Sequence, residues 1–303
     1  KTKITYLKTV AMENISNVEE IKALIALLDD EDEFIFENVN KKINELGEDT
    51  IPYLQKGFEN SQNALQRKRL AFLLDKFKLI KLNNEITNWS KNEAHDLLKG
   101  LIHIAQFGFP NFKISHLEKV LDQLKEEIEP LIKGKSNYEI MQEMNKIILD
   151  KYQFGSNFKN YSGVNNSFIN KVIEDKIGNP IMLCIIYLLV AKSLNINLIG
   201  INSPKHFILA IIQDKGEEVV FYNDELIDQV EFYIDPFHKG IFYGSEKFDS
   251  MLKEMNFDFN DKVFLPATNL DIIKRVINNL IYALHTTGEK KFAKSLLKIV
   301  DAL

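Results

Sequence analysis

A cysteine, a histidine and an aspartate, which together can form a site with an activated thiol, occur in this order along one stretch of this 303-residue chain. Cys184 is the single cysteine, His206 opens an apolar segment, and Asp235 closes another. In a cysteine-nucleophile site the histidine takes the thiol proton, and the acidic residue holds the imidazole in its orientation. The order Cys, His, Asp therefore indicates acyl-transfer chemistry, provided that the fold brings the three side chains together.

The elements that must position these residues can be predicted from the same stretch. Gly178-Asn179-Pro180 is typical of a helix start, because asparagine is a good N-cap and proline fits the first helical position. The apolar run 181–191 predicts a buried helix that carries Cys184. Short segments rich in β-branched and aromatic residues predict a small antiparallel sheet, with strands at 197–202, 206–214, 217–224 and 231–235.

Cys184 has two interpretations. It lies four residues after Pro180 and thus about 5–6 Å further along the same helix face. Activation by the helix dipole fades beyond the first turn, and the neighbouring side chains are all apolar, so an inert core thiol is expected. The alternative is a displaced nucleophile, with His206 reaching down to the sulfur. His206 and Asp235 could also be an ordinary strand-start histidine and an Asp-Pro turn, and His238 is expected at the surface.

The remainder of the chain predicts helices. Residues 1–85 carry amphipathic helices in pairs, a pattern similar to HEAT-type repeats, although a plain helical bundle has the same periodicity. Residues 86–265 would form the central domain, with helices interrupted by a turn at Pro110 and Asn166-Ser167 capping a short helix. Residues 266–303 predict a helical hairpin of tetratricopeptide type. The fold class is therefore α+β, predominantly α.

Composition excludes several classes of protein. A net charge of −5 and only three arginines among 38 basic residues argue against nucleic-acid binding. A single cysteine allows no internal disulfide, and no apolar run is long enough to span a membrane, so a cytoplasmic location is expected. The six histidines show no metal-ligand spacing, and no cofactor motif is present, so neither a metal nor a cofactor is expected. The oligomeric state stays open.

Several collinear segments resemble bacterial transglutaminase-like proteins of the SirB type, which join a transglutaminase-like core to tetratricopeptide units. The resemblance covers about residues 90–303, and some members are expected to carry HEAT-like helices before the core. The segments that carry it are DLLKGLIHIAQFGFPNF, NSFINKVIEDKIGNPIMLCIIYLLVAKSL, INSPKHFILAI and YIDPFHKG.

The resemblance implies that Gly178-Asn179-Pro180 replaces the Gly-x-Cys of true transglutaminases, with Pro180 at the nucleophile position. His206 and Asp235 match the catalytic histidine and its orienting acid. The leading hypothesis is a non-catalytic binding or scaffolding module, whose cleft at Asn179, Pro180, His206 and Asp235 takes a peptide or small polar ligand. The alternative is a cysteine-dependent amidase, peptidase or transglutaminase that uses Cys184, His206 and Asp235. A third hypothesis is a helical-repeat scaffold in which the central domain serves only as structure.

Overall fold

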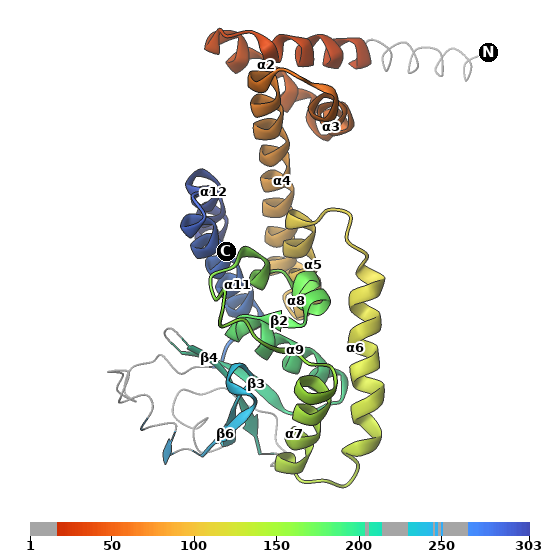
Figure 1. The fold of residues 1–303 in the computed structure, drawn as a ribbon, viewed down its shortest axis with the longest axis vertical. Coiled ribbons are helices and arrows are strands. Elements are labelled where there is room, and N and C mark those ends of the chain that lie inside the picture. The colour runs from red at the N-terminus through yellow and green to blue at the C-terminus, as the bar shows by residue number, and fades with distance from the viewer. Residues whose placement is uncertain (1–16, 204–205, 214–229, 245, 248–249, 251–265) are drawn as a thin grey trace, which may run out of the picture. The chain divides into compact units, whose positions relative to one another are not determined.

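The computed structural model describes residues 17–203, 206–213, 230–244, 246–247, 250 and 266–303. These residues are mostly helical and include a small antiparallel sheet, which confirms the predicted fold class (Figure 1). The chain forms two compact units, Lys1–Leu82 and Asn83–Leu303. The boundary falls within helix α4 (Ala64–Asn92), as does the predicted boundary after residue 85.

Helix α4 is longer than the helix predicted at 64–82. Residues 83–92 contain neither glycine nor proline to end the helix, and the apolar spacing continues. Leu82, Ile86 and Trp89 lie at i, i+4 and i+7, and all three are buried. The Trp89 indole also donates a hydrogen bond to the Asp96 carbonyl at 2.8 Å, so the end of α4 is fixed to the turn that follows it.

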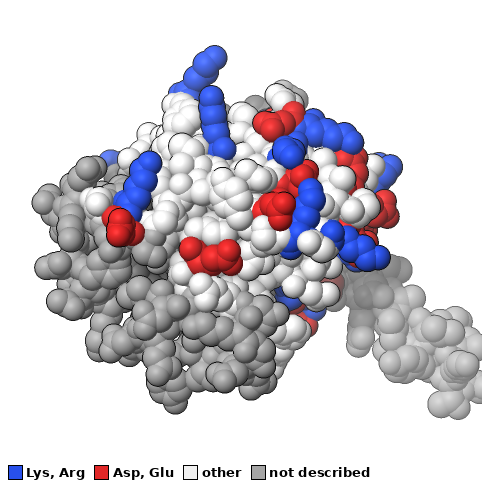
Figure 2. Space-filling model, turned by 90° about the horizontal axis from the view of Figure 1, so that it is seen from below, with Lys and Arg blue, Asp and Glu red and all other residues white. Residues whose placement is uncertain are grey.

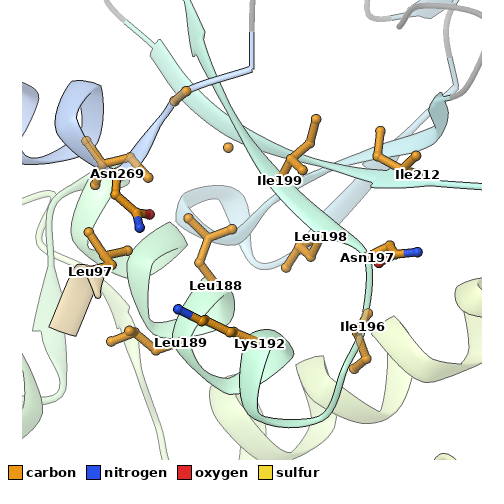
Figure 3. Close-up of a pocket in the computed structure, with 13 residues that line it drawn as sticks. Leu97, Leu188, Leu189, Lys192, Ile196, Asn197, Leu198, Ile199, Ile212 and Asn269 are labelled. Carbon is orange, nitrogen blue, oxygen red and sulfur yellow. The ribbon is translucent and has the colours of Figure 1, made fainter. Parts of the chain in front are cut away.

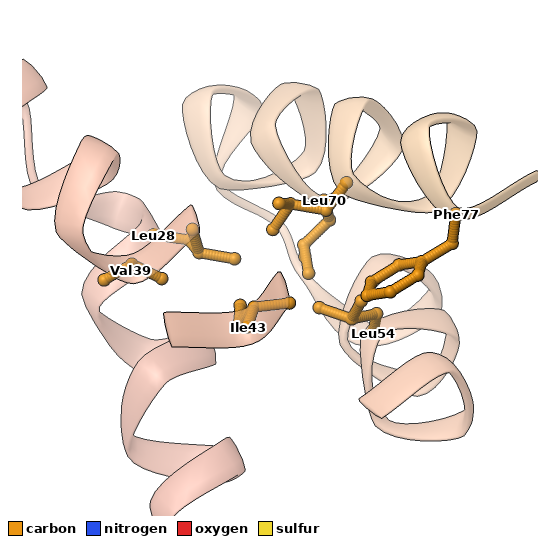
Figure 4. Close-up of a cluster of buried hydrophobic side chains, with 7 residues drawn as sticks. Leu28, Val39, Ile43, Leu54, Leu70 and Phe77 are labelled. Carbon is orange, nitrogen blue, oxygen red and sulfur yellow. The ribbon is translucent and has the colours of Figure 1, made fainter. Parts of the chain in front are cut away.

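The described residues of the first unit are helical. Residues 17–26 form a helix, and α2 is capped by Asp32, whose side chain accepts from the Phe34 amide at 2.8 Å. Seven buried apolar side chains form the core of this unit: Leu28, Val39, Ile43, Leu54, Leu70, Leu73 and Phe77 (Figure 4). The finer assignment to HEAT-type repeats stays a prediction. The further elements of the unit are η1 (Leu27–Asp29), α2 (Glu33–Leu46), η2 (Gly47–Thr50) and α3 (Ile51–Asn60).

The second unit contains most of the described helices and all four strands of the sheet. Its helices are α5 (Leu97–Gly108), α6 (Ile114–Ile128), η3 (Glu129–Leu131), α7 (Asn137–Asn145), the π-helical η4 (Lys146–Lys151), η5 (Val164–Ser167), α8 (Ile169–Asp175), α9 (Pro180–Ser193), η7 (Pro236–His238), α11 (Asn269–Thr286) and α12 (Lys290–Asp301). The predicted turn at Pro110 is confirmed between α5 and α6. The predicted cap of α8 is wrong, because the N-cap is Phe168 and the Asn166 amide donates instead to the Asn160 and Tyr161 carbonyls.

The sheet is antiparallel in the order β3 (Leu198–Ser203), β4 (His206–Ile212), β5 (Val230–Asp235) and β6 (Ile241–Tyr243). Three of these strands agree with the predictions, whereas β6 was not predicted. The strand expected at 217–224 lies outside the described residues. Two further short strands, β1 (Gly155–Ser156) and β2 (Ile177–Gly178), pair in parallel, and β2 directly precedes α9.

Helix α9 is the centre of the second unit. Its residues from Pro180 to Tyr187 are all buried, as expected for a helix that is apolar on every side. It contacts β3 and β4 of the sheet, helix α6 and the turn η7 (Figure 1). The start of β4, at Phe207, and the turn η7 after β5 therefore lie close to α9.

The hairpin of α11 and α12 belongs to the second unit. Gly288 lies in the turn with φ +91°, a conformation that favours glycine. Helix α11 packs on α5, α9, η5 and β3, because a single hairpin cannot bury its apolar face alone. The tetratricopeptide assignment of this hairpin stays a prediction.

Candidate functional site

The start of α9 is a fully formed helix cap, as the sequence predicts. Asn179 has extended backbone (φ −83°, ψ 171°), and its side-chain oxygen accepts a hydrogen bond from the Met182 amide at 3.1 Å. Pro180 occupies the first helical turn, where its missing N–H costs nothing. Asn179 is only 5% exposed and Pro180 is buried, so both residues are committed to the helix start.

Cys184 lies in the interior of the protein. Its side chain is 0% exposed, and its thiol donates a hydrogen bond to the Phe207 carbonyl at 3.4 Å. Burial, and secondarily the nearby charge of Asp235, raises the pKa of the Cys184 thiol well above its ordinary value. A reactive cysteine needs the opposite, namely partial exposure and a lowered pKa. The sequence-based expectation of a core thiol agrees with this environment.

His206 and Asp235 form a close pair, although they are 29 positions apart in the chain. Strand β4 runs antiparallel to β5 with Leu209 opposite Ile234, so the beginning of β4 lies beside the end of β5. The His206 Nε2 atom lies 2.9 Å from the Asp235 Oδ2 atom. The structure thus brings together two of the three predicted site residues.

The two oxygens of the Asp235 carboxylate have different partners. Oδ1 accepts from the amides of Phe237 at 3.0 Å and of His238 at 3.2 Å, and so caps the turn η7. Oδ2 faces two imidazoles, those of His206 and of His238. Burial raises the pKa of the Asp235 carboxyl, but the hydrogen bonds and charges of both histidines outweigh that effect and lower it below the ordinary value. Each of the two predictions for Asp235 describes one oxygen of this carboxylate. The Asp-Pro turn accounts for the contacts of Oδ1, and the histidine partner accounts for the contact of Oδ2 with His206.

His238 belongs to the site and was missed at the sequence level. Its Nδ1 atom lies 2.7 Å from Asp235 Oδ2, and its side chain is 47% exposed, against 11% for His206. His238 is therefore exposed, as expected, but it also contacts the buried Asp235 carboxylate. The signal was the Asp-Pro-x-His spacing, because an aspartate that caps a tight turn brings the side chain three positions later back over its own carboxylate.

The loop after His238 is fixed to the core by one asparagine. Asn145 donates to the Gly240 carbonyl at 2.9 Å and accepts from the Tyr187 hydroxyl at 2.7 Å. Burial raises the pKa of Tyr187 well above its ordinary value, so the hydroxyl stays a donor. Gly240 has φ +67°, and a Cβ atom there would overlap the Asn145 amide. The chain that presents His238 is thus held in place on the α9 side.

Exposed aromatic side chains lie next to His238. Phe158 is 65% exposed and Tyr161 is 51% exposed, and both are in edge contact with Phe237 at centroid distances of 4.8 and 5.8 Å. The Phe158 ring is also 6.2 Å from the His238 ring. We call Phe158, Tyr161, Phe237 and His238 the aromatic rim. Exposed aromatic residues that lie beside polar groups are typical of binding surfaces.

Two cavities of the second unit lie away from this pair. One, of about 340 Å³, is lined by side chains from the end of α9, from β3 and from the start of α11 (Figure 3). Its lining is mostly aliphatic, and its Lys192 ammonium donates to the His95 carbonyl at 2.9 Å. The other, of about 450 Å³, lies between α5, α6 and α9. Neither is lined by Asn179, His206 or Asp235, the residues of the expected ligand cleft.

The surface charge is mixed. Figure 2 shows acidic and basic side chains interspersed around an area of uncharged residues on the described part of the face that it presents. This distribution agrees with the net charge of −5. Among the described residues, none of the helices combines the length and the apolar character that a membrane span needs.

The helix, the antiparallel sheet and the His–Asp pair at the strand ends define a transglutaminase-like core. Residues 115–278 match the family described as the transglutaminase-like superfamily, and because the match covers more than half of the chain, the protein belongs to this superfamily. The relation to SirB-type members within it stays a prediction.

Individual relatives are distant. A UPF0162 protein of Xylella fastidiosa (strain 9a5c) is 24% identical over 220 residues, which are 69% of this chain and 73% of that protein. A UPF0162 protein of the strain Temecula1 is 27% identical over 126 residues, 41% of this chain and 45% of the relative. The F-box only protein 21 of Homo sapiens is 24% identical over 153 residues, 50% of this chain but only 22% of its own length. No solved structure matches significantly.

Proposed function

We propose that this transglutaminase-like domain is a non-catalytic module that binds a peptide segment of a protein partner. One observation carries the proposal. The helix start that would hold a nucleophile is capped by Asn179 and filled by Pro180, and the chain's single cysteine is buried one turn deeper. Thiol-dependent acyl transfer needs an accessible thiolate beside a histidine. Cys184 has neither the exposure nor the lowered pKa.

The alternative, an acyl-transfer enzyme that uses Cys184, His206 and Asp235, has weaker support. The Cys184 thiol is directed to a backbone carbonyl, and the imidazole of His206 is directed by its Nε2 atom to Asp235. A substrate amide would have to reach a sulfur atom that has no exposed surface. The retained pair of His206 and Asp235 is therefore better explained as part of a binding surface.

The aromatic rim is the part of that surface on which we base the choice of ligand. Phe158 and Tyr161 expose large apolar rings beside the half-exposed His238 imidazole. Aromatic rings supply much of the binding energy at peptide and protein interfaces, and imidazole supplies hydrogen bonds. The match to F-box only protein 21 covers 22% of that protein, so a related domain occurs as one part of a longer chain. A cytoplasmic location stays a prediction.

Thiol labelling tests the non-catalytic part. Folded wild-type protein is treated with iodoacetamide, and modification of Cys184 is followed by mass spectrometry with and without denaturant. The control is the variant Cys184→Ala with Ser115→Cys, which carries its single thiol on the exposed face of α6. We expect rapid labelling of the control and labelling of Cys184 only in denaturant. Fast labelling of Cys184 in the folded protein would favour the enzyme instead.

A peptide array tests the binding part. Wild-type protein and the variants Phe158→Ala and Tyr161→Ala are applied to arrayed peptides of varied sequence, and bound protein is quantified. The control is Tyr282→Ala, which removes a 62% exposed aromatic ring elsewhere in the same unit. We expect a set of peptides whose binding is lost in both rim variants and kept in the control. Binding that is unchanged in the rim variants, or an array without bound peptides, would contradict a peptide site at this position.

A further inference from the structure

The cluster of His206, Asp235 and His238 has a donor set that none of its parts has alone. Each residue offers one ligand atom, two imidazole nitrogens and one carboxylate oxygen, and these atoms lie within 4.8 Å of one another. His206 comes from the start of β4, whereas Asp235 and His238 come from the end of β5 and the turn η7. The sequence spacing hides this set, because its first member lies 29 positions upstream of the second.

Two imidazoles and one carboxylate are a preferred ligand set for transition-metal ions. Zinc sites with three protein ligands and one open position use this set, and so do non-haem iron sites. We propose that His206, Asp235 and His238 together bind a divalent transition-metal ion, with Zn²⁺ as the reference ion. The proposal rests on the proposed function in one respect, namely that the His206 imidazole does not serve as the base for a catalytic thiol.

The surroundings of Asp235 support a ligand role. A ligating carboxylate is usually oriented by hydrogen bonds to its second oxygen, and here Oδ1 accepts from two backbone amides. The side chain is 1% exposed, so it cannot turn away into solvent. Oδ2 is thereby held toward both histidines before any ion arrives. The Asp235 side chain therefore loses little conformational entropy when a metal ion binds.

The distances are close to those that a bound ion requires. With bonds of about 2.0–2.1 Å, ligand atoms around a tetrahedral zinc ion lie about 3.3 Å apart. Asp235 Oδ2 now lies 2.9 Å from the His206 nitrogen and 2.7 Å from the His238 nitrogen. These two separations must widen by about half an ångström, whereas the nitrogens of His206 and His238, which lie within 4.8 Å of each other, must come to the same separation of about 3.3 Å. The 47% exposed side chain of His238 can make this movement, and it also provides the access route from solvent.

A bound ion would define what the proposed module recognises. The aromatic rim leaves the cluster accessible at His238, so the open coordination position would face an approaching peptide. A carboxylate or imidazole of the partner could then complete the coordination sphere. The class of ligand is therefore a peptide with an acidic residue or a histidine next to an apolar one.

The test measures zinc binding directly. Protein stripped of metal by a chelator is titrated with Zn²⁺ in competition with a chromophoric zinc indicator. The variants are His238→Ala, His206→Ala and Asp235→Asn, and the matched control is His116→Ala, which removes an exposed histidine from α6. Mg²⁺ serves as the control ion, since it prefers oxygen ligands. Circular dichroism establishes that each variant is folded, and Co²⁺ absorption reports the coordination geometry.

We expect an equimolar zinc complex in the wild type and in His116→Ala, and at least about tenfold weaker binding in each of the three cluster variants. His238 is the decisive position, because its side chain is 47% exposed and its loss is expected to disturb the fold least. Absence of an equimolar complex would overturn the proposal, as would equal affinity in wild type and His238→Ala. Either result leaves the labelling of Cys184 unaffected, so failure of the metal site is distinguishable from failure of the non-catalytic assignment.

Discussion

The cap of α9 allows a direct test of whether Gly178-Asn179-Pro180 has become a structural element. The test substitution is Asn179→Ala, which removes the oxygen that accepts from the Met182 amide. Both residues are almost completely buried, with exposures of 5% and 0%. Water therefore cannot replace the lost acceptor. If the segment serves as a helix start, Asn179→Ala should mainly lower the free energy of unfolding of the protein.

The magnitude follows from this burial. Loss of an N-cap side chain costs about 0.5–2 kcal/mol, with about 1 kcal/mol typical of exposed helix ends. A buried amide left without a partner costs about 1–3 kcal/mol, so Asn179→Ala belongs at the upper end of the capping range, at about 2 kcal/mol. For a unit of this size, that loss corresponds to a melting temperature about 4–8 °C lower.

The assay uses Trp89, the single tryptophan of the chain, which is 0% exposed and lies in the second unit. Its fluorescence reports unfolding of this unit in urea or on heating. Ser136→Ala is the matched control, because Ser136 caps the exposed start of α7 in a capping box. We expect it to cost about 0.5–1 kcal/mol. Asn179→Ser retains a capping oxygen and should recover about half of the loss.

Two results would refute this reasoning. If Asn179→Ala costs no more than Ser136→Ala, burial of the cap has no energetic consequence, and the Asn179 side chain must be retained for another reason. If Asn179→Ser is as damaging as Asn179→Ala, the loss comes from side-chain volume and not from the hydrogen bond.

Two further predictions concern the residues around the candidate site. Because the pKa of Asp235 is lowered in the folded protein, its charge contributes stability above the unfolded-state value of about 3.9, and this contribution is lost as pH falls through the folded-state pKa. The difference in unfolding free energy between wild type and Asp235→Asn, from urea titrations, should therefore shrink between about pH 5 and pH 3; a constant difference would contradict it. Gly240→Ala should cost about 2 kcal/mol, since an alanine at φ +67° is strained and would overlap the Asn145 amide. The melting temperature of this variant should be well below that of Gly155→Ala, whose Cβ meets open space. Equal melting temperatures of the two variants would contradict the overlap.

Much of the fold could be predicted from local patterns. The cap and proline of α9, the helical periodicity around it and three short strands follow from residue types within a few positions of one another. The extent of α4 and the cap of α8 were predicted incorrectly. The apolar spacing of α4 continues as far as Trp89, and hydrogen bonds to the preceding loop decided the position of Asn166. Trp89 packs beyond the expected helix end, and Asn166 bonds to the preceding loop instead of the following helix.

The candidate site could be predicted only in part, for a related reason. The pairing of His206 with Asp235 was predicted from the resemblance to transglutaminase-like proteins, and the structure has it at 2.9 Å. His238 could not be placed, because its position depends on a turn whose geometry is set by the Oδ1 atom of Asp235. Burial of Cys184 was expected from its apolar neighbours, but its hydrogen bond to Phe207 depends on how the sheet packs on α9.

The partners of the Asp235 carboxylate bear on the non-catalytic role that we propose for the pair of His206 and Asp235. A charged group with 1% exposure is costly unless hydrogen bonds offset its desolvation. The turn cap at Oδ1 explains why a side-chain acceptor is present at this position, but it makes no use of Oδ2 or of either histidine. An amide side chain at this position could provide the same cap without a buried charge. The turn cap therefore accounts for Oδ1, whereas the convergence of His206 and His238 on Oδ2 is the feature to which our metal-site proposal assigns a role, and the zinc titration tests that role directly.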